Sequence, residues 1–290
     1  MMKIRIIQFI IISLALSTVQ IGCTTEKSGK NSLIDFRDSH SVRSRKPILI
    51  AHRGGVITPQ SPECSIAAIR LAKQQGYAMV ELDIRKSRDN VPVVFHDNDM
   101  RKACGIDKSI EEFNVSEIVK IAYVNTDQKI CTLDRTLSLC RSLKLGLMLD
   151  VKITGDERFF QKIVTLIKKH GYENSSITIN GDPDLRRHLK EIALLTVTQD
   201  EFKKVQQGLS CDLRNKFWFG LPPSLTSEMV KPLQRNGAYV IPAINTFRYP
   251  EQGHYELAHK DIQRLNEAGV DGYQIDSVYQ PLFLEKDSQK

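Results

Sequence analysis

The sequence lacks the features that mark several common classes of protein. No apolar run reaches the roughly 20 residues that a membrane-spanning helix needs. Aromatic residues make up only 7% of the chain, and no basic stretch is interleaved with them, so we expect no nucleic-acid partner. No two of the six cysteines have CxxC spacing, which disfavours a zinc or thioredoxin-like motif.

The first 23 residues are predicted to be an export signal. Lys3 and Arg5 precede an apolar stretch from Ile6 to Leu16, which fits the central region of a signal and is too short to span a membrane. The following VQIGC resembles a bacterial lipobox, so we expect lipidation of Cys23, with simple cleavage as the alternative. The protein is therefore predicted to lie in the periplasm or cell envelope and to contact a membrane through this lipid.

The rest of the chain has the composition of an ordinary folded protein, with 41% hydrophobic and 26% charged residues overall. After removal of Lys3 and Arg5, 39 basic residues oppose 34 acidic ones, a mild excess. Residues 24–46 are polar, serine-rich and basic and are predicted to be a flexible tether, which places the folded domain at residues 47–290. Five cysteines besides Cys23 cannot all pair, and both a disulfide and buried free thiols stay open.

Apolar, strand-like runs alternate with helical patterns from residue 47 onward. Eight runs are predicted to be strands: 48–52, 79–84, 145–151, 176–180, 193–197, 217–221, 238–244 and 272–276. The intervening helices include residues 64–76, 132–143, 157–171 and 261–269, several ending at or near a glycine. This alternation predicts an α/β fold, a TIM-type (β/α)8 barrel, with a doubly wound open sheet as the alternative.

Polar side chains stand at the carboxyl ends of these strands, where a TIM barrel places its chemistry. Those from the first three strands are the strongest candidates for an active site. In chain order the candidates are His52, Arg53, Glu81, Asp83, Asp150, Lys152, Asn180, Asn245 and Asp276.

Residues 79–97 are predicted to form a β-hairpin that projects above the second barrel strand. Asp89 and Asn90 lie between two apolar arms as a two-residue turn. About that turn, Asp83 is expected opposite His96, on the face that Glu81 also shares. Two carboxylates and an imidazole should then converge.

Glu81, Asp83 and Asp150 would bring three carboxylates into one barrel mouth, where their repulsion requires a cation. Ligand sets made only of oxygen select a hard metal, Ca²⁺ or Mg²⁺, rather than zinc. The alternative for Glu81 and Asp83 is an exposed strand face.

His52 and His96 suit acid and base roles beside such a metal, because an imidazole titrates near neutral pH. Arg53 and Lys152 could hold a phosphate group of the substrate, the first as a fork and the second as a point charge. Ordinary ion pairing is the alternative for both. Glu63, just before the first helix, is either a helix-start residue stabilised by the helix dipole or a direct participant in the chemistry of the site.

Five motifs occur in order: AHRGG (51–55), PE (62–63), ELD (81–83), HD (96–97) and LDVK (149–152). Together they resemble the glycerophosphodiester phosphodiesterase family, whose members are TIM-barrel relatives of phosphatidylinositol-specific phospholipase C. The resemblance implies an enzyme that hydrolyses a small-molecule glycerophosphodiester to glycerol 3-phosphate and an alcohol. It also implies that His52 and His96 act as general acid and base, that Glu81 and Asp83 bind Ca²⁺ or Mg²⁺, and that Arg53 contacts phosphate.

Four positions depart from the pattern of that family. Cys64 replaces an Asn after the Pro-Glu pair, and Asp150 replaces the usual Glu, one methylene longer. Pro242 stands where a Trp is common, and Ile275 where a Thr is usual. The last two lie where the leaving alcohol would be recognised.

Two other functions are compatible with the same barrel. A lipid-directed phosphodiesterase of the sphingomyelinase D or phospholipase C type needs an apolar rim at the mouth, and the sequence shows no obvious exposed apolar loop there. A non-catalytic surface binding protein would have lost activity through the changes at Cys64, Asp150 and Pro242.

Overall fold

The computed structural model describes residues 32–179 and 181–284. The predicted export signal with Cys23, the first part of the predicted tether (24–31) and the candidate Asn180 lie outside these residues. None of the described helices is both long and apolar enough to cross a bilayer.

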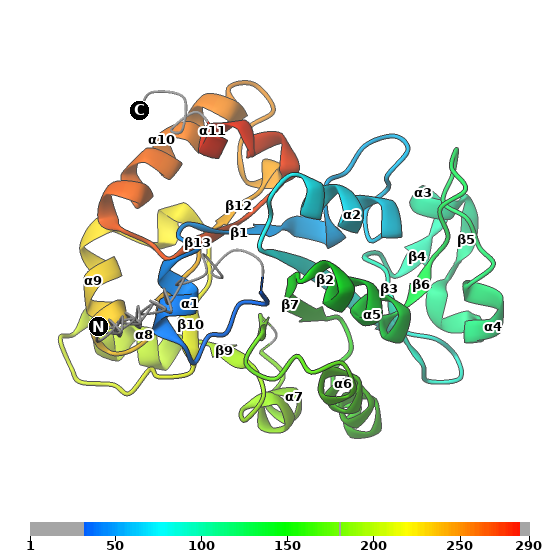
Figure 1. Ribbon diagram of the computed structural model, residues 1–290, viewed down its shortest axis with the longest axis horizontal. Helices are drawn as coiled ribbons and strands as arrows, with labels where there is room; N and C mark the ends of the chain where they lie inside the picture. Colours follow the sequence, from blue (N-terminus) through cyan, green and yellow to red (C-terminus); the bar gives the residue numbers. More distant parts are fainter. Residues whose placement is uncertain (1–31, 180, 285–290) are drawn as a thin grey trace, which may run out of the picture.

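Parallel strands form a ring with helices around it, a TIM-type barrel (Figure 1). Each of the eight runs predicted to be a strand overlaps one, so these predictions are confirmed. Neighbouring strands of the ring follow one another along the chain, which excludes a doubly wound open sheet. The barrel strands are β1 (Ile48–Ala51), β2 (Met79–Lys86), β7 (Gly146–Val151), β8 (Ser176–Thr178), β9 (Leu194–Thr196), β10 (Lys216–Trp218), β11 (Tyr239–Val240), β12 (Ala243–Ile244) and β13 (Gly272–Ile275).

β11 and β12 together make one barrel strand, interrupted at Pro242. β11 pairs with β10 and β12 pairs with β13, which closes the ring. Pro242 has no N–H to donate, but its carbonyl accepts from the Gln274 amide at 3.0 Å, and the Ile241 amide donates to Trp218 at 3.0 Å. The ladder therefore continues across the interruption.

Helices follow most barrel strands and cover the outside of the ring (Figure 1). They bury one apolar face each, as α6 does with Phe159, Phe160, Ile163 and Ile167. The outer helices are α2 (Ile66–Gln74), α5 (Leu133–Leu143), α6 (Glu157–Lys169), α7 (Pro183–Leu189), α8 (Gln199–Gln206), α9 (Ser227–Arg235), α10 (His254–Ala268) and α11 (Pro281–Leu284), with a 3-10 turn η3 (Pro222–Ser224) before α9. The four helices predicted from the sequence correspond to α2, α5, α6 and α10.

Alternation along the strands separates the interior of the barrel from the layer beneath the helices. On β2, Met79 packs in the interior with Ile48 and Ile50, whereas Val80 and Leu82 pack in the outer layer. Glu81 and Asp83 have the parity of Met79 and so face the interior, above the apolar residues that fill it.

Residues 32–46, just before β1, cover the end of the barrel at which the strands begin, so this part of the predicted tether is folded. It contains helix α1 (Ser39–Arg43), and Ile34, Phe36 and Val42 are at most 4% exposed, packed against the interior core. The Phe36 amide donates to the Asn174 carbonyl at 2.9 Å, and the hydroxyl of Tyr239 donates to the Phe36 carbonyl at 2.9 Å. The predicted boundary at Pro47 is therefore too late, since three apolar residues in a polar stretch close this end.

Residues 92–132 form a side unit with its own core, on the right of Figure 1. The unit joins the barrel through β3, which pairs with both β2 and β6. It contains β3 (Pro92–Val94), β4 (Asp99–Met100), α3 (Arg101–Cys104), β5 (Ile106–Ser109), η2 (Ile110–Glu112), α4 (Val115–Ile118) and β6 (Cys131–Thr132). The hairpin predicted above β2 is thus the edge of a larger structure.

The predicted register of this hairpin is wrong by one residue. β2 pairs with β3 through Ile84 and Val94, and the Phe95 amide donates to the Asp83 carbonyl at 3.0 Å. The reason is a three-residue loop, Arg88 to Asn90, in which Asn90 adopts a left-handed conformation with φ 60°. Asp83 therefore lies opposite Phe95, not His96.

The cysteines of the described residues are free thiols. The sequence left open a disulfide or free thiols, and the described part of the chain has free thiols and no disulfide. They are Cys64, Cys104, Cys131, Cys140 and Cys211.

Candidate active site

A tight turn after β1 positions the first site residues. His52, Arg53 and Gly54 form a 3-10 turn, η1 (His52–Gly54), in which Arg53 has φ 51° and Gly54 has φ 77°. A Cβ atom on Gly55 would lie 2.2 Å from the Ala68 carbonyl oxygen, so only glycine lets this turn approach α2 so closely. The glycines of the HRGG motif therefore bring the end of β1 against the start of α2.

Three carboxylates meet at the mouth of the barrel, as predicted. Asp83 on β2 and Asp150 on β7 are register partners, and oxygens of Glu81, Asp83 and Asp150 lie within 4.8 Å of one another. Glu81 and Asp83 are each 1% exposed. Burial, and then the charges of Asp83 and Asp150, raise the pKa of Glu81 well above its usual value, although it accepts a hydrogen bond from the Arg53 amide at 2.7 Å.

Lys152 lies among these carboxylates. Its Nζ atom is 2.9 Å from Asp83 Oδ1 and 2.5 Å from Asp150 Oδ2. Although burial opposes protonation, these two charges raise the pKa of Lys152 above its usual value. One ammonium group facing three carboxylates leaves the cluster with excess negative charge.

The donor chemistry of this cluster fits a hard divalent cation. Its ligand atoms are carboxylate oxygens, which Ca²⁺ and Mg²⁺ both prefer. Cys64 lies close by, with Sγ 3.7 Å from Asp83 Oδ2, but burial raises the pKa of this thiol and keeps it neutral. Cys64 therefore donates to Asp83 where the amide of an Asn was expected.

His52 is oriented by residues from two other strands. Its Nδ1 atom lies 2.6 Å from Asp276 Oδ1 and 3.2 Å from Asn245 Nδ2. Asp276 also accepts from the amide and hydroxyl of Thr246, at the start of η4 (Thr246–Arg248). Burial alone would raise the pKa of Asp276, but the hydrogen bond and charge of His52 and the Thr246 contacts lower it overall. Nε2 is the ring nitrogen left for proton transfer.

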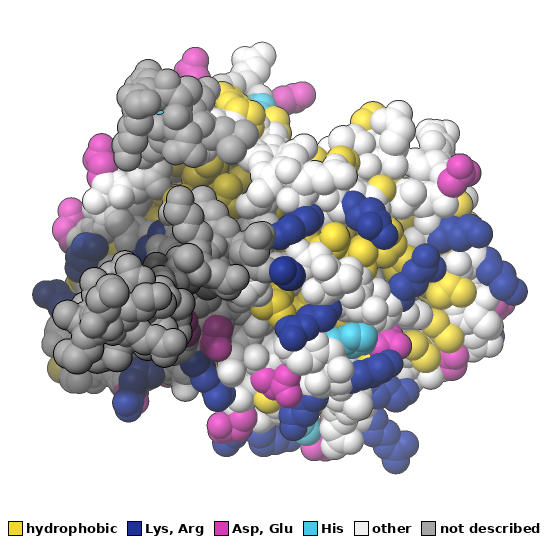
Figure 2. Space-filling model, in the orientation of Figure 1, with side chains coloured by type: hydrophobic (Ala, Val, Ile, Leu, Met, Phe, Trp, Pro, Cys, Tyr) yellow, Lys and Arg dark blue, Asp and Glu magenta, His cyan; other side chains and the backbone are white. Residues whose placement is uncertain are grey.

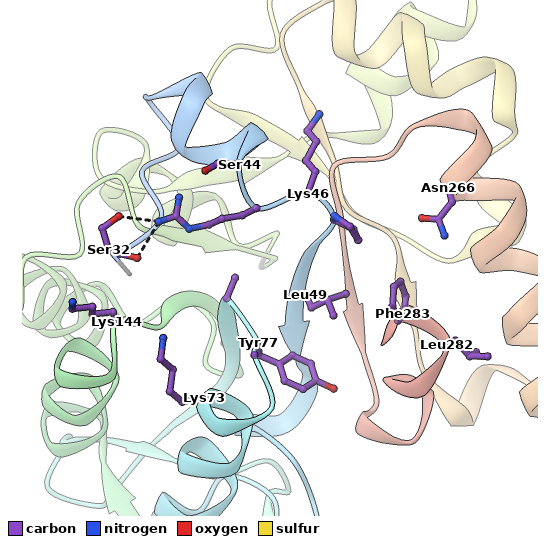
Figure 3. Close-up of a pocket in the computed structure, with 14 residues that line it drawn as sticks. Ser32, Ser44, Lys46, Leu49, Lys73, Tyr77, Lys144, Asn266, Leu282 and Phe283 are labelled. Atoms are coloured by element: carbon purple, nitrogen blue, oxygen red, sulfur yellow. Dashed lines mark hydrogen bonds between the residues drawn. The ribbon is translucent and has the colours of Figure 1, made fainter. Parts of the chain in front are cut away.

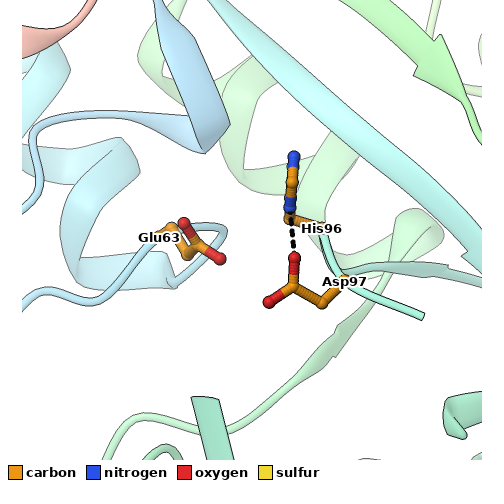
Figure 4. A group of neighbouring side chains, drawn as sticks. All are labelled: Glu63, His96 and Asp97. Atoms are coloured by element: carbon orange, nitrogen blue, oxygen red, sulfur yellow. Dashed lines mark hydrogen bonds and ion pairs between the residues drawn. The ribbon is translucent and has the colours of Figure 1, made fainter. Parts of the chain in front are cut away.

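His96 lies beside Glu63 instead of facing Asp83 across the hairpin (Figure 4). Its Nδ1 atom is 2.6 Å from Asp97 Oδ1, and ligand atoms of Glu63, His96 and Asp97 lie within 4.8 Å of one another. Glu63 also accepts from the Arg53 guanidinium at 2.8 Å. Glu63 thus contacts Arg53 and lies next to His96, so a direct part in the chemistry of the site stays a prediction.

Sequence reasoning assigned no role to Asp97, Asn245 or Asp276. Asp97 stands in the HD motif, and the other two end strands β12 and β13, so their positions carried a signal. The role of Asn245 and Asp276 could not be read from that signal, because their contacts with His52 join residues about 190 to 220 positions apart. Asp97 contacts the neighbouring His96.

The mouth also carries exposed apolar side chains, contrary to expectation. Phe247 in η4 is 59% exposed, and its ring centroid is 6.1 Å from that of His52. Ile57 after β1 is 43% exposed, and Val278 in η5 (Ser277–Tyr279) after β13 is 46% exposed. None of the three belongs to a long apolar run, so the sequence gives little sign of them.

Comparison with solved structures defines the class to which the barrel belongs. A phosphodiesterase of Oleispira antarctica, solved in complex with the product sn-glycerol-3-phosphate, has a TM-score of 0.64 and 21% sequence identity. The match covers 85% of this chain and 99% of that one. The fold is therefore the TIM barrel found in phosphodiesterases.

Sequence comparison shows which enzymes the chain is similar to. The model of the glycerophosphoryl diester phosphodiesterase family matches residues 52–169. A glycerophosphodiester phosphodiesterase of Caldanaerobacter subterraneus is 24% identical over 243 residues, which cover 78% of this chain and 93% of that protein. Human glycerophosphodiester phosphodiesterase 1 is 34% identical over 111 residues, 36% of this chain and only 33% of the human protein. Over these stretches the chain is similar to glycerophosphodiester phosphodiesterases, and the family model covers the part of the barrel from η1 to α6.

Proposed function

We propose that the protein hydrolyses glycerophosphodiesters to glycerol 3-phosphate and an alcohol, and that the reaction depends on a divalent cation. The observation that carries this proposal is the cluster of Glu81, Asp83 and Asp150, whose excess negative charge lies beside two histidines in the mouth of the barrel. The same mouth holds an arginine, Arg53.

The three carboxylates would hold Ca²⁺ or Mg²⁺. Such an ion would supply positive charge that stabilises the phosphate oxygens in the transition state. Asp150 is one methylene shorter than the usual Glu, which favours Ca²⁺, because Ca²⁺ tolerates irregular coordination better than Mg²⁺.

Side chains of this chain would bind the phosphate and move the protons. Arg53, held by Glu63 at 2.8 Å, offers its remaining N–H groups to the phosphate. Lys152 adds positive charge beside Asp83 and Asp150. His52 and His96, each against a carboxylate, would take the proton of the nucleophile and return one to the leaving alkoxide. The nucleophile is water or a neighbouring hydroxyl of glycerol.

Product release from defined substrates tests this proposal. We expect purified protein from residue 24 onward to release glycerol phosphate from at least one of several glycerophosphodiesters, and a chelator to stop the release. His52→Ala should lower the rate about 10²–10⁴-fold without loss of folding, as removal of a general acid or base does. Absence of metal-dependent release from every diester would favour the non-catalytic binding protein.

A lipid-directed substrate is the second candidate, favoured by the exposed Phe247, Val278 and Ile57 at the mouth. An acyl chain leaving the site would cover these side chains. Rates on a micellar lysophospholipid and on a soluble glycerophosphodiester separate the two. Phe247→Ser should lower only the micellar rate if the substrate is a lipid, and neither rate if it is soluble.

We also propose that Cys23 carries a lipid and holds the protein at the cell envelope, because VQIGC resembles a lipobox. Labelling of growing cells with a radioactive fatty acid should mark the protein, and Cys23→Ser should remove the label. An unlabelled wild-type protein would instead indicate simple cleavage.

A further inference from the structure

A cavity of about 520 Å³ lies at the end of the barrel opposite the catalytic mouth. Its wall includes residues just before three strands: Arg45 before β1, Tyr77 before β2 and Lys144 before β7. Lys73 from the last turn of α2 also lines it (Figure 3). The carboxylates and histidines of the mouth do not line this cavity.

The cavity carries positive charge that no described carboxylate neutralises directly. Lys46 pairs with Asp271, but the described residues provide no ion pair for Arg45, Lys73 or Lys144. Among the described residues, Arg45 donates to oxygens of Ser41 and Ser32, the latter at 2.9 and 3.0 Å. Figure 2 shows Lys and Arg side chains gathered on the face seen in Figure 1, with hydrophobic side chains between them.

The cations lie close enough to repel one another. Burial, and then the charges of Lys144 and Arg45, lower the pKa of Lys73. The helix dipole accounts for each lysine taken alone, because cations are stabilised at helix C-termini: Lys73 lies in the last turn of α2 and Lys144 caps α5. It does not explain why both point to the cavity that Arg45 also lines. An anion would relieve this repulsion.

The opposite wall of the cavity is mostly apolar, with the side chain of Asn266 on the same side. In Figure 3, Lys73 and Lys144 lie on one side, and Leu49, Leu282 and Phe283 on the other. A ligand that satisfies both walls carries an anionic group at one end and an apolar part at the other.

We propose that this cavity binds a phosphate group carried by a partly apolar molecule, with Lys73 and Lys144 at the phosphate and the positive charge of Arg45 beside them. Lysine is a usual protein partner of phosphate, as a point charge. Arg45 adds charge without a direct contact, because Ser32 and Ser41 hold both of its terminal nitrogens. The site is separate from the one that the proposed function uses.

Two sources share this chemistry: the headgroup of an anionic phospholipid and a soluble phosphate ester. Cys23, the predicted lipid attachment site, is nine residues before Ser32, which lines the cavity. Nine residues span at most about 30 Å. If Cys23 is lipidated, the cavity lies within reach of the bilayer surface, where each basic side chain gains from anionic lipids.

The test compares two variants of equal charge in the protein from residue 24 onward, which keeps every described element. Lys73→Gln/Lys144→Gln removes two cations of the cavity. Lys120→Gln/Lys260→Gln removes two exposed lysines that do not line it. One arm measures cosedimentation with vesicles of phosphatidylglycerol or of phosphatidylcholine, and the other measures calorimetric binding of a short-chain alkyl phosphate.

We expect binding in at least one arm, reduced about tenfold or more in the cavity variant and little changed in the control variant. If the cavity variant loses binding only to phosphatidylglycerol vesicles, the ligand is a lipid headgroup. If it loses binding only to the alkyl phosphate, the ligand is a soluble phosphate ester. Both variants should hydrolyse a soluble glycerophosphodiester like the wild type, so failure here is distinct from failure of the proposed catalysis. No binding in either arm, or equal loss in both variants, would overturn the proposal.

Discussion

Each histidine of the mouth contacts a carboxylate, and these contacts fix which ring nitrogen faces the substrate. Asp276 holds Nδ1 of His52 at 2.6 Å, and Asp97 holds Nδ1 of His96 at 2.6 Å. In both cases Nε2 remains for proton transfer. The carboxylates are therefore positioning residues for the proposed acid and base.

Asp276→Asn should change how stability depends on pH. The pKa of Asp276 is lowered in the folded protein, so its stabilising contribution is present above the unfolded pKa of about 3.9 and is lost as the pH falls through the lower folded value. The variant should be less stable than wild type at pH 7, with a gap that shrinks below pH 4. Urea unfolding at pH 7 and pH 3 measures this, with the exposed Asp127→Asn as control. A gap that does not depend on pH would contradict the account.

Lys152→Gln should destabilise the protein more without metal than with it. Lys152 is the cation seen between Asp83 and Asp150, so its loss leaves three carboxylates without a neutralising side chain. Bound Ca²⁺ should offset much of that repulsion. Thermal unfolding of wild type and variant, each with chelator and with Ca²⁺, gives the four values needed. Equal destabilisation under both conditions would show that the cluster does not hold the ion.

The strands and the residues at their ends could be predicted from the sequence because their spacing is regular. Strand ends of a parallel barrel meet at one mouth, so Glu81, Asp83 and Asp150 could be placed together from the sequence. The position of His96 could not, because it depends on the length of one loop. Ser87 Oγ donates to Asp89 at 2.6 Å and accepts from the Val91 amide at 2.9 Å, contacts that favour a three-residue loop over a two-residue turn.

Asn90→Gly and Asn90→Ala test this loop. Asn90 has φ 60°, a left-handed conformation that glycine adopts freely and alanine does not. Asn90→Ala should lower the free energy of unfolding by about 1 kcal/mol, and Asn90→Gly should leave it nearly unchanged. Denaturant unfolding of both variants measures the difference, and equal stability would argue against the left-handed turn.

Phe36→Ala tests whether the segment before β1 belongs to the fold. Phe36 is 4% exposed and packs in the interior core, with its ring centroid 5.6 Å from that of Tyr239. The substitution should cost about 3–5 kcal/mol, as for other buried phenylalanines. Leu209→Ala, at a residue 53% exposed, is the matched control and should cost less than about 0.5 kcal/mol. A loss of unfolding free energy at Phe36 as small as that of the control would support the prediction that this segment is a flexible tether.

The whole molecule has two chemically different ends. The mouth gathers carboxylates and histidines, and the opposite end gathers Arg45, Lys73 and Lys144 around a cavity. The sequence predicted the first end because its residues follow strands in recognisable motifs. It could not predict the second, because those cations come from loops and helix ends whose meeting depends on the closed barrel. A molecule bound to a membrane by its basic end would present its mouth to soluble substrates.

The central claim is that the carboxylates of the mouth hold a cation needed for phosphodiester hydrolysis. The most direct measurement is the rate of glycerol phosphate release as Ca²⁺ or Mg²⁺ is titrated into chelator-treated protein, with bound metal determined in the same samples. The rate should rise in proportion to bound metal, and Glu81→Gln should weaken metal binding and lower the rate together. Full activity without bound metal, or metal binding unchanged in Glu81→Gln, would contradict the account.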